Sequence, residues 1–312
     1  MTEAERRAMR GLVATLLGNP TPFAAADLPL DLVRRHLLAP LAYKAGVAAL
    51  RNDYIASSLQ AERRAVVLSE ALDALGSAGT PVILLKGIAY AGSIYADPAE
   101  RPMSDIDLLV RSPDMPVAER ALTRLGYWRA GSAAQSSVTR HAITLKRRDG
   151  SIDLHRHVLH AGRSRIDIAA IWRDAEPSHI AGARRPAPVH EYILHAAHIG
   201  RHEGLVPLVN YVDAARLEPD ASDRALATLS SQWRVSRAVD AVGVARRDLG
   251  DGGGERGHLL SFPSSDEILA GALPPRWLQI SRKLRMIDDS LGVIGLAVAT
   301  VRGRVASRKI RS

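Results

Sequence analysis

The chain has 312 residues, enough for two domains or for one large domain with an appendage, and no cysteine, which excludes disulfides, thiolate metal sites and cysteine nucleophiles. Hydrophobic residues make up 46% of the sequence but aromatic residues only 4%, so leucine, valine, isoleucine and alanine must fill the core. The net charge of +9 favours anionic partners such as nucleotides, nucleic acid or anionic lipid, and the lack of cysteine fits a cytoplasmic location.

Residues 1–75 are predicted to be helical. Charged residues interrupt the apolar ones near the N-terminus, which is typical of an amphipathic helix and unlike a secretory signal. Pro20, Pro22 and Pro40 break the helical pattern, and residues 54–75 form a long amphipathic stretch that ends near a glycine. We therefore expect an N-terminal helical segment over residues 1–75.

The pattern changes in the next hundred residues, 76–175. Residues 81–85 and 105–110 are short apolar runs, typical of buried strands. Residues 88–95 and 113–126 have the spacing of helices. This part of the chain therefore predicts an α+β core, with a small mixed β-sheet and flanking helices.

The dipeptide Asp149-Gly150 is a strong signal for a tight turn. Residues 142–147 before it and 151–158 after it have the composition of strands. The sequence therefore predicts a β-hairpin that closes through this dipeptide.

Residues 176–312 are predicted to form a C-terminal helical region with a basic tail. Residues 189–201 and 206–217 have the clearest helical periodicity, and a glycine-rich break follows residue 251. No segment reaches the roughly 20 apolar residues that span a bilayer, so no transmembrane segment is expected. The nearest, residues 291–301, precedes the basic tail and fits either a core helix with a solvated end or a segment on a membrane surface.

Three aspartates are the candidate catalytic and metal-binding residues. Asp105 and Asp107 share one face of their predicted strand, because successive side chains on a strand alternate. Two carboxylates this close repel each other unless a cation lies between them, and Mg²⁺ binds carboxylate and phosphate oxygens. Asp153 would join them if the second hairpin arm pairs beside the Asp105 strand. The pattern predicts a metal site for phosphoryl transfer, and acids on a solvated strand face are the alternative.

Basic residues and a glycine surround these acids in the sequence. Lys86 and Gly87 lie where a strand ends and a helix begins, and free backbone N–H groups at such a point bind phosphate. Arg101, four residues before Asp105, could bind a phosphate or neutralise the acids. The structural alternatives are a solvated strand end for Lys86 and an ion pair that holds the loop for Arg101.

These residues together resemble a known family, the uncharacterised nucleotidyltransferases of the DNA polymerase β-like nucleotidyltransferase superfamily. The resemblance covers residues 80–160, and a looser one extends into the helical region at His195, His198 and Asp213. The motifs that carry it are Leu84-Leu85-Lys86-Gly87, then Tyr95, Pro98 and the run from Arg101 through Ser104, Asp105, Ile106 and Asp107 to Val110, and finally Ile152-Asp153-Leu154-His155.

The resemblance implies that residues 76–175 form a nucleotidyltransferase core. Asp105 and Asp107 would bind two metal ions, and Asp153 would complete the catalytic one. The glycine motif lacks the serine that is usual in the superfamily, so the resemblance does not specify how the triphosphate would be bound. The residues implied to lie at the nucleotide are Lys86, Gly87, Arg101, Ser104 and His155.

The activity implied is transfer of a nucleoside monophosphate from a nucleoside triphosphate, with ATP as the expected one, in the presence of Mg²⁺ or Mn²⁺. The acceptor would be a hydroxyl or similar group on a small molecule, sugar, peptide or protein, as in polysaccharide or modified-peptide biosynthesis. The alternative is a module of the same fold that binds nucleotide or nucleic acid without chemistry, and three intact acids argue against it. Nucleic acid is not favoured as a partner, because stacking aromatics are few.

Histidines form a second group of candidates. His155 and His157 share the face of Asp153 and would contact substrate or support the sheet edge, and His160 follows them. Four more lie along one predicted helix, with a spacing that can bind zinc but without the glutamate of the metalloprotease motif. Packing against the core, or contact with the base or acceptor, is therefore favoured for His190, His195, His198 and His202.

Overall fold

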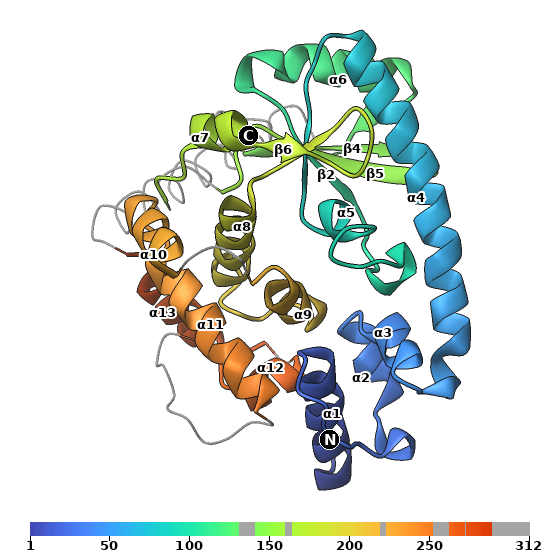
Figure 1. Ribbon diagram of the computed structural model, residues 1–312, viewed down its shortest axis with the longest axis vertical. Coiled ribbons are helices and arrows are strands. Elements are labelled where there is room, and N and C mark those ends of the chain that lie inside the picture. The colour runs from blue at the N-terminus through green and yellow to red at the C-terminus, as the bar shows by residue number, and fades with distance from the viewer. Residues whose placement is uncertain (131–140, 160–163, 219–222, 252–261, 272, 289–312) are drawn as a thin grey trace, which may run out of the picture.

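The structure is a computed structural model that describes residues 1–130, 141–159, 164–218, 223–251, 262–271 and 273–288. Its fold is α+β, as predicted: one mixed seven-stranded sheet with helices around it. In Figure 1, α6 lies above the strands and α8 below them. No helix in the described part of the chain is long and apolar enough to cross a membrane.

The sheet has the strand order β3-β4-β5-β2-β1-β7-β6. Its central strand β2 pairs parallel with β5 and antiparallel with β1. Every residue of β1 and β2 is buried, as expected for strands that are covered on both faces. The strands are β1 Ile83–Leu85, β2 Ile106–Leu109, β3 Trp128–Arg129, β4 Ala142–Arg147, β5 Gly150–His155, β6 Glu176–Pro177 and β7 Arg184–Arg185.

The helices fall into an N-terminal group, a group against the sheet and a C-terminal group. The longest, α4, runs along one side of the molecule from the N-terminal helices to the sheet (Figure 1). The α-helices are α1 Glu3–Leu16, α2 Leu30–Arg35, α3 Ala39–Lys44, α4 Arg51–Ser77, α5 Gly87–Tyr90, α6 Met115–Arg124, α7 Ile168–Asp174, α8 Pro188–Arg201, α9 Val209–Arg216, α10 Asp223–Gln232, α11 Ser236–Gly250, α12 Ser265–Ala270 and α13 Arg276–Arg285. The 3₁₀ helices are η1 Ala25–Asp27, η2 Ala48–Leu50, η3 Pro98–Glu100 and η4 Ser112–Asp114.

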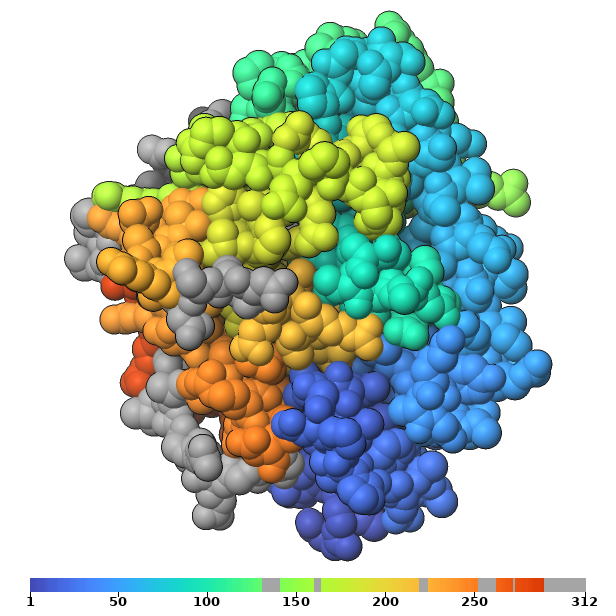
Figure 2. Space-filling view, viewed as in Figure 1, coloured from blue at the N-terminus to red at the C-terminus, as the bar shows by residue number. Residues whose placement is uncertain are grey.

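The two ends of the described chain meet. Helix α1 packs against α11, and Figure 2 shows the N-terminal segment (blue) against the α11–α12 part of the chain (orange). Arg10 of α1 forms an ion pair of 2.6 Å with Asp266 of α12. Buried residues from all parts of the fold belong to one hydrophobic cluster. The division of the chain at residues 75 and 175 stays a prediction.

The hairpin forms between β4 and β5, but its turn differs from the prediction. Arg147 pairs with Gly150, so the two turn residues are Arg148 and Asp149. The glycine is used for close packing: a Cβ atom at Gly150 would lie 3.2 Å from the side chain of Val67 on α4. The turn is held by Arg147, whose Nε donates to Asp149 over 2.6 Å.

Three further elements differ from the predictions. The helix expected over residues 88–95 ends at Tyr90, because the backbone of Ala91 is extended and Gly92 has a φ of +85°. Strands β6 and β7 were not predicted, since two residues are too few to have a period. The predicted break after residue 251 and the tail after residue 288 lie outside the described residues, as does His160.

Candidate active site

The sheet brings two of the three predicted aspartates together. Asp107 on β2 lies directly opposite Asp153 on the parallel strand β5, and Asp105 comes immediately before β2, outside the strand. Because side chains alternate along a strand, Asp153 and His155 share a face. Ligand atoms of Asp107, Asp153 and His155 lie within 4.8 Å of one another. We call Asp105, Asp107 and Asp153 the acid cluster.

Asp107 is the buried member of the acid cluster. Its Oδ1 accepts a hydrogen bond of 2.6 Å from Lys86 Nζ and one of 2.7 Å from His155 Nε2. Burial alone would raise the pKa of Asp107, but the hydrogen bond from His155 and the charge of Lys86 lower it well below its usual value. Asp107 is therefore ionised, with one oxygen occupied by the two donors.

The pKa of Asp105 is shifted in the opposite direction, upward. Burial raises its pKa, and the nearby charges of Asp107 and Asp153 raise it further. The hydrogen bond of 3.1 Å that it accepts from Ser104 Oγ compensates only in part. The pKa of Asp105 is therefore raised first by burial and then by the two neighbouring carboxylates, whose repulsion a bound cation would relieve.

Lys86 adopts a rare backbone conformation at the end of β1. Its φ of 54° and ψ of −139° lie outside the regions that side chains other than glycine usually adopt, and such residues are enriched at functional sites. Gly87 follows and permits close packing, because a Cβ atom there would lie 3.3 Å from the sulfur of Met103. Arg64 of α4 donates to the Met103 carbonyl over 3.0 Å. This packing fixes the point where Lys86 turns toward Asp107.

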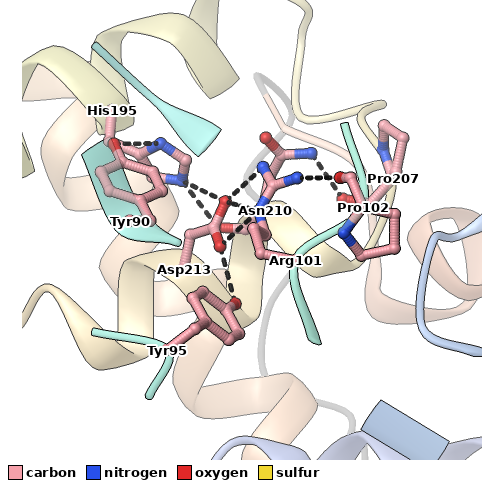
Figure 3. Close-up of polar contacts among 8 residues, drawn as sticks. All are labelled: Tyr90, Tyr95, Arg101, Pro102, His195, Pro207, Asn210 and Asp213. Carbon is pink, nitrogen blue, oxygen red and sulfur yellow. Dashed lines mark hydrogen bonds and ion pairs between the residues drawn. The ribbon is translucent and has the colours of Figure 1, made fainter. Parts of the chain in front are cut away.

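Arg101 does not join the acid cluster. Its guanidinium forms a two-pronged ion pair with Asp213 of α9, with Nε 2.8 Å from Oδ1 and Nη2 2.6 Å from Oδ2 (Figure 3). Tyr95 donates to the same Oδ1 over 2.7 Å, and Arg101 Nη1 donates to the Pro102 carbonyl over 2.6 Å. The arrangement matches the structural alternative for Arg101, an ion pair that holds the loop.

The buried network around Asp213 continues into α8 through His195. His195 Nε2 donates to the Asn210 carbonyl over 2.8 Å, so its Nδ1 accepts from the Tyr90 hydroxyl over 3.2 Å (Figure 3). Burial lowers the pKa of His195 and keeps the ring neutral. We call Arg101, Asp213, Tyr95, His195 and Tyr90 the Asp213 network. It ties the loop before β2 to the helices below the sheet.

A small cavity lies against α8, beside Lys86 and His155. Its volume of about 20 Å³ is enough to hold about one water molecule, and its lining includes Lys86, Tyr90, His155, Glu191, His195 and His198. Glu191 is buried beside Arg185, and its Oε1 has no hydrogen-bond partner among the described residues. Burial raises the pKa of Glu191 to about 7, against the lowering effect of Arg185. The sequence reading missed Glu191, because a lone glutamate on an amphipathic helix is usually exposed.

The other histidines have mainly packing contacts. His157 Nδ1 accepts from the backbone N–H of Leu159 over 3.2 Å, and the ring of His190 packs on Trp233. His198 and His202 contact each other edge to face, with ring centroids 4.9 Å apart. Within the described ranges, the only group of three or more potential metal ligands is the one at Asp107, so the α8 histidines do not form a zinc site there.

The chain matches the model of one protein family and is similar to solved structures of a nucleotidyltransferase. The profile of the uncharacterised nucleotidyltransferase family matches residues 26–244. A solution structure of the antibiotic-resistance factor ANT(2'')-Ia matches with 16% identity and a TM-score of 0.35, over 59% of this chain and 91% of that one. A crystal structure of ANT(2'')-Ia with adenylyl-2''-tobramycin matches with 15% identity and a TM-score of 0.35, over 59% and 97%.

No curated protein sequence matches the chain. The family match spans more than two thirds of the residues and includes both the acid cluster and the Asp213 network. The chain therefore belongs to the uncharacterised nucleotidyltransferase family and is a nucleotidyltransferase.

Proposed function

We propose that the enzyme transfers a nucleoside monophosphate from a nucleoside triphosphate, with ATP as the expected donor, to a hydroxyl of a second substrate, and that it needs Mg²⁺ or Mn²⁺. The observation that carries the proposal is the register of the two parallel strands. It pairs Asp107 with Asp153, while Asp105 comes immediately before β2 and Lys86 donates to Asp107 over 2.6 Å. Carboxylates gathered beside a cationic group are what phosphoryl transfer requires.

The acid cluster fits a divalent cation. Its donors are carboxylate oxygens, which Mg²⁺ prefers, and His155 lies close enough to Asp107 and Asp153 to orient them or to add a ligand. Burial raises the pKa of Asp105, and the charges of Asp107 and Asp153 raise it further, so a cation at this position would stabilise its ionised form. Asp105, Asp107 and Asp153 would hold the metal, which would supply positive charge to the phosphates and to the attacking oxygen.

Lys86 has two roles in this proposal. Its side chain is 30% exposed, so the ammonium that contacts Asp107 can also meet a phosphate at the mouth of the site. The hydrogen bond from His155 holds the Asp107 carboxylate in place on its buried side. Arg101 lies away from the phosphates, and we assign it to holding the loop that carries Ser104 and Asp105.

The reaction replaces a phosphoanhydride bond of the triphosphate with a phosphate ester bond to the acceptor. The acceptor oxygen loses its proton to water and bonds to the α-phosphorus, while the bond from that phosphorus to the bridging oxygen breaks and pyrophosphate leaves. The cluster's residues orient the two oxygens in line. The acceptor would be a small molecule, sugar, peptide or protein.

The proposal is tested by incubating the full chain with each α-labelled nucleoside triphosphate, Mg²⁺ and a panel of hydroxyl acceptors. We expect label to move to an acceptor with equimolar pyrophosphate release, and Asp153→Asn to abolish both. The matched control is Asp73→Asn, an exposed aspartate on α4, which should transfer label like the wild type. Tight triphosphate binding without pyrophosphate release under any condition would instead favour the binding-module alternative.

A further inference from the structure

Helix α13 lies on the side of the molecule opposite α4 (Figure 1) and exposes an apolar stripe. Trp277, Ile280 and Leu284 follow one another at spacings of three and four residues, so they share one face of the helix. Their exposed fractions are 70%, 54% and 41%, and that of Leu273, just before the helix, is 76%. We call these four residues the α13 stripe. Large apolar side chains that are exposed together usually mark an interaction site.

The opposite side of α13 is fixed to the body of the protein. Arg282 is buried and forms an ion pair of 2.9 Å with Glu267 of α12. Beyond the helix, Met286 and Ile287 are buried, and the Asp288 carboxylate accepts from the backbone N–H of Ser236 over 2.8 Å. These contacts set the rotation of α13 about its axis, so the stripe faces outward.

Basic residues lie on the same helix as the stripe. Arg276 and Arg285 are exposed on α13, and Lys283 is partly exposed. From Arg276 to the C-terminus the sequence has nine basic and two acidic residues, so this stretch accounts for seven of the nine net positive charges of the chain. The positive charge of the protein is therefore concentrated on and after the helix that exposes the apolar stripe.

We propose that α13 docks the enzyme onto an anionic lipid surface, with the α13 stripe among the acyl chains and the basic residues at the headgroups. An amphipathic helix with tryptophan and leucine on one face and arginine and lysine beside them is suited to that boundary. A nucleic acid would use the same charges but would leave Leu273, Ile280 and Leu284 without a partner.

The test is sedimentation of the full chain with vesicles of two compositions, phosphatidylcholine alone and phosphatidylcholine with phosphatidylglycerol. We expect binding to the anionic vesicles only, weakened by added salt. The double variant Trp277→Ala with Ile280→Ala should bind about tenfold more weakly, because it removes most of the apolar contact. The control variant, Leu59→Ala with Val66→Ala, changes equally exposed apolar residues on α4 and should bind like the wild type.

Four outcomes would overturn the proposal. They are failure of the wild type to bind anionic vesicles, equal binding by the α13 and control variants, binding of duplex RNA with the same dependence on α13, and a dimer in sedimentation velocity that only the α13 variant loses. Circular dichroism and thermal unfolding of each variant verify that the fold is intact. Nucleotidyl transfer in solution is measured separately, so a failure of vesicle binding and a failure of the proposed activity are distinguishable.

Discussion

Two charged groups lie six residues apart in the sequence and differ in how their charges are compensated. Arg101 forms an ion pair with Asp213, and the side chains of both are almost fully buried. Asp107 accepts hydrogen bonds from Lys86 and His155. The acid cluster to which it belongs nevertheless has three carboxylates, and the charges of Asp107 and Asp153 raise the pKa of Asp105. The first arrangement is complete without a ligand, and the second is not. The comparison teaches that one motif can contain both a structural pair and a site that requires a cation.

The largest expected effect is on catalysis and comes from the acid cluster. Asp107→Asn keeps the size of the side chain but removes the charge that a metal ion requires, so turnover should fall on the order of 10³-fold or more, equivalent to about 4 kcal/mol in the barrier. The measurement is label transfer at saturating triphosphate. Thermal unfolding should show an intact fold. Wild-type turnover by this variant would refute the role of the acid cluster.

A substitution in the Asp213 network should lower the stability of the fold. Asp213→Asn leaves the buried guanidinium of Arg101 without a counter-charge, so the free energy of unfolding should fall by about 3–5 kcal/mol. Urea unfolding measures it. The double variant Arg101→Met with Asp213→Leu removes both charges and should recover part of the loss. A loss below about 1 kcal/mol in the single variant would show that the pair is solvated.

Glu191 lies between the two regions, in the cavity that Lys86 and His195 also line. Its pKa is raised from 4.5 to about 7 in the folded protein, so the folded state binds the proton more tightly than the unfolded state. Stability from this group is therefore fully present below pH 4.5 and declines as the pH rises toward 7. Between pH 5 and 7 the decline should be about 2 kcal/mol.

The measurement compares urea unfolding of the wild type and of Glu191→Gln at pH 5 and pH 7. Glutamine does not titrate, so the variant should lack this part of the decline, and the difference between the two proteins should change by about 2 kcal/mol. An unchanged difference would mean that Glu191 is already ionised at pH 5 through its pair with Arg185.

The sequence predicted the strands that carry Asp107 and Asp153, because both strands follow simple rules. Alternation predicts that Asp105 and Asp107 share one face, and the apolar residues beside Asp153 mark a second buried strand. The resemblance to the family indicated that these two strands lie together. The Asp107–Asp153 register could not be read from the sequence alone, since a shift of one residue would move Asp153 to the other face.

The partners of the Asp213 network were beyond sequence reasoning. Arg101 and Asp213 are 112 residues apart, and nothing in local periodicity selects one aspartate among many. Their positions are fixed by the packing of α9 against the loop before β2. The turn at Arg148-Asp149 was missed for a similar reason: Gly150 is required by the neighbouring Val67 and not by its own backbone conformation. Long-range packing, which sequence patterns do not encode, explains both differences.

The smallest expected effect is the change in melting temperature on adding Mg²⁺, and it distinguishes the acid cluster from the Asp213 network directly. A ligand that binds only the folded state adds about 1.4 kcal/mol of stability at ten times its dissociation constant. Mg²⁺ should therefore raise the melting temperature of the wild type relative to EDTA, and Asp107→Asn should lose this response. Asp213→Asn should keep the response while melting at a lower temperature, because its acid cluster is unchanged. Equal Mg²⁺ shifts in the wild type and Asp107→Asn would mean that the ion binds elsewhere, and the contrast between an open site and a closed pair would fail.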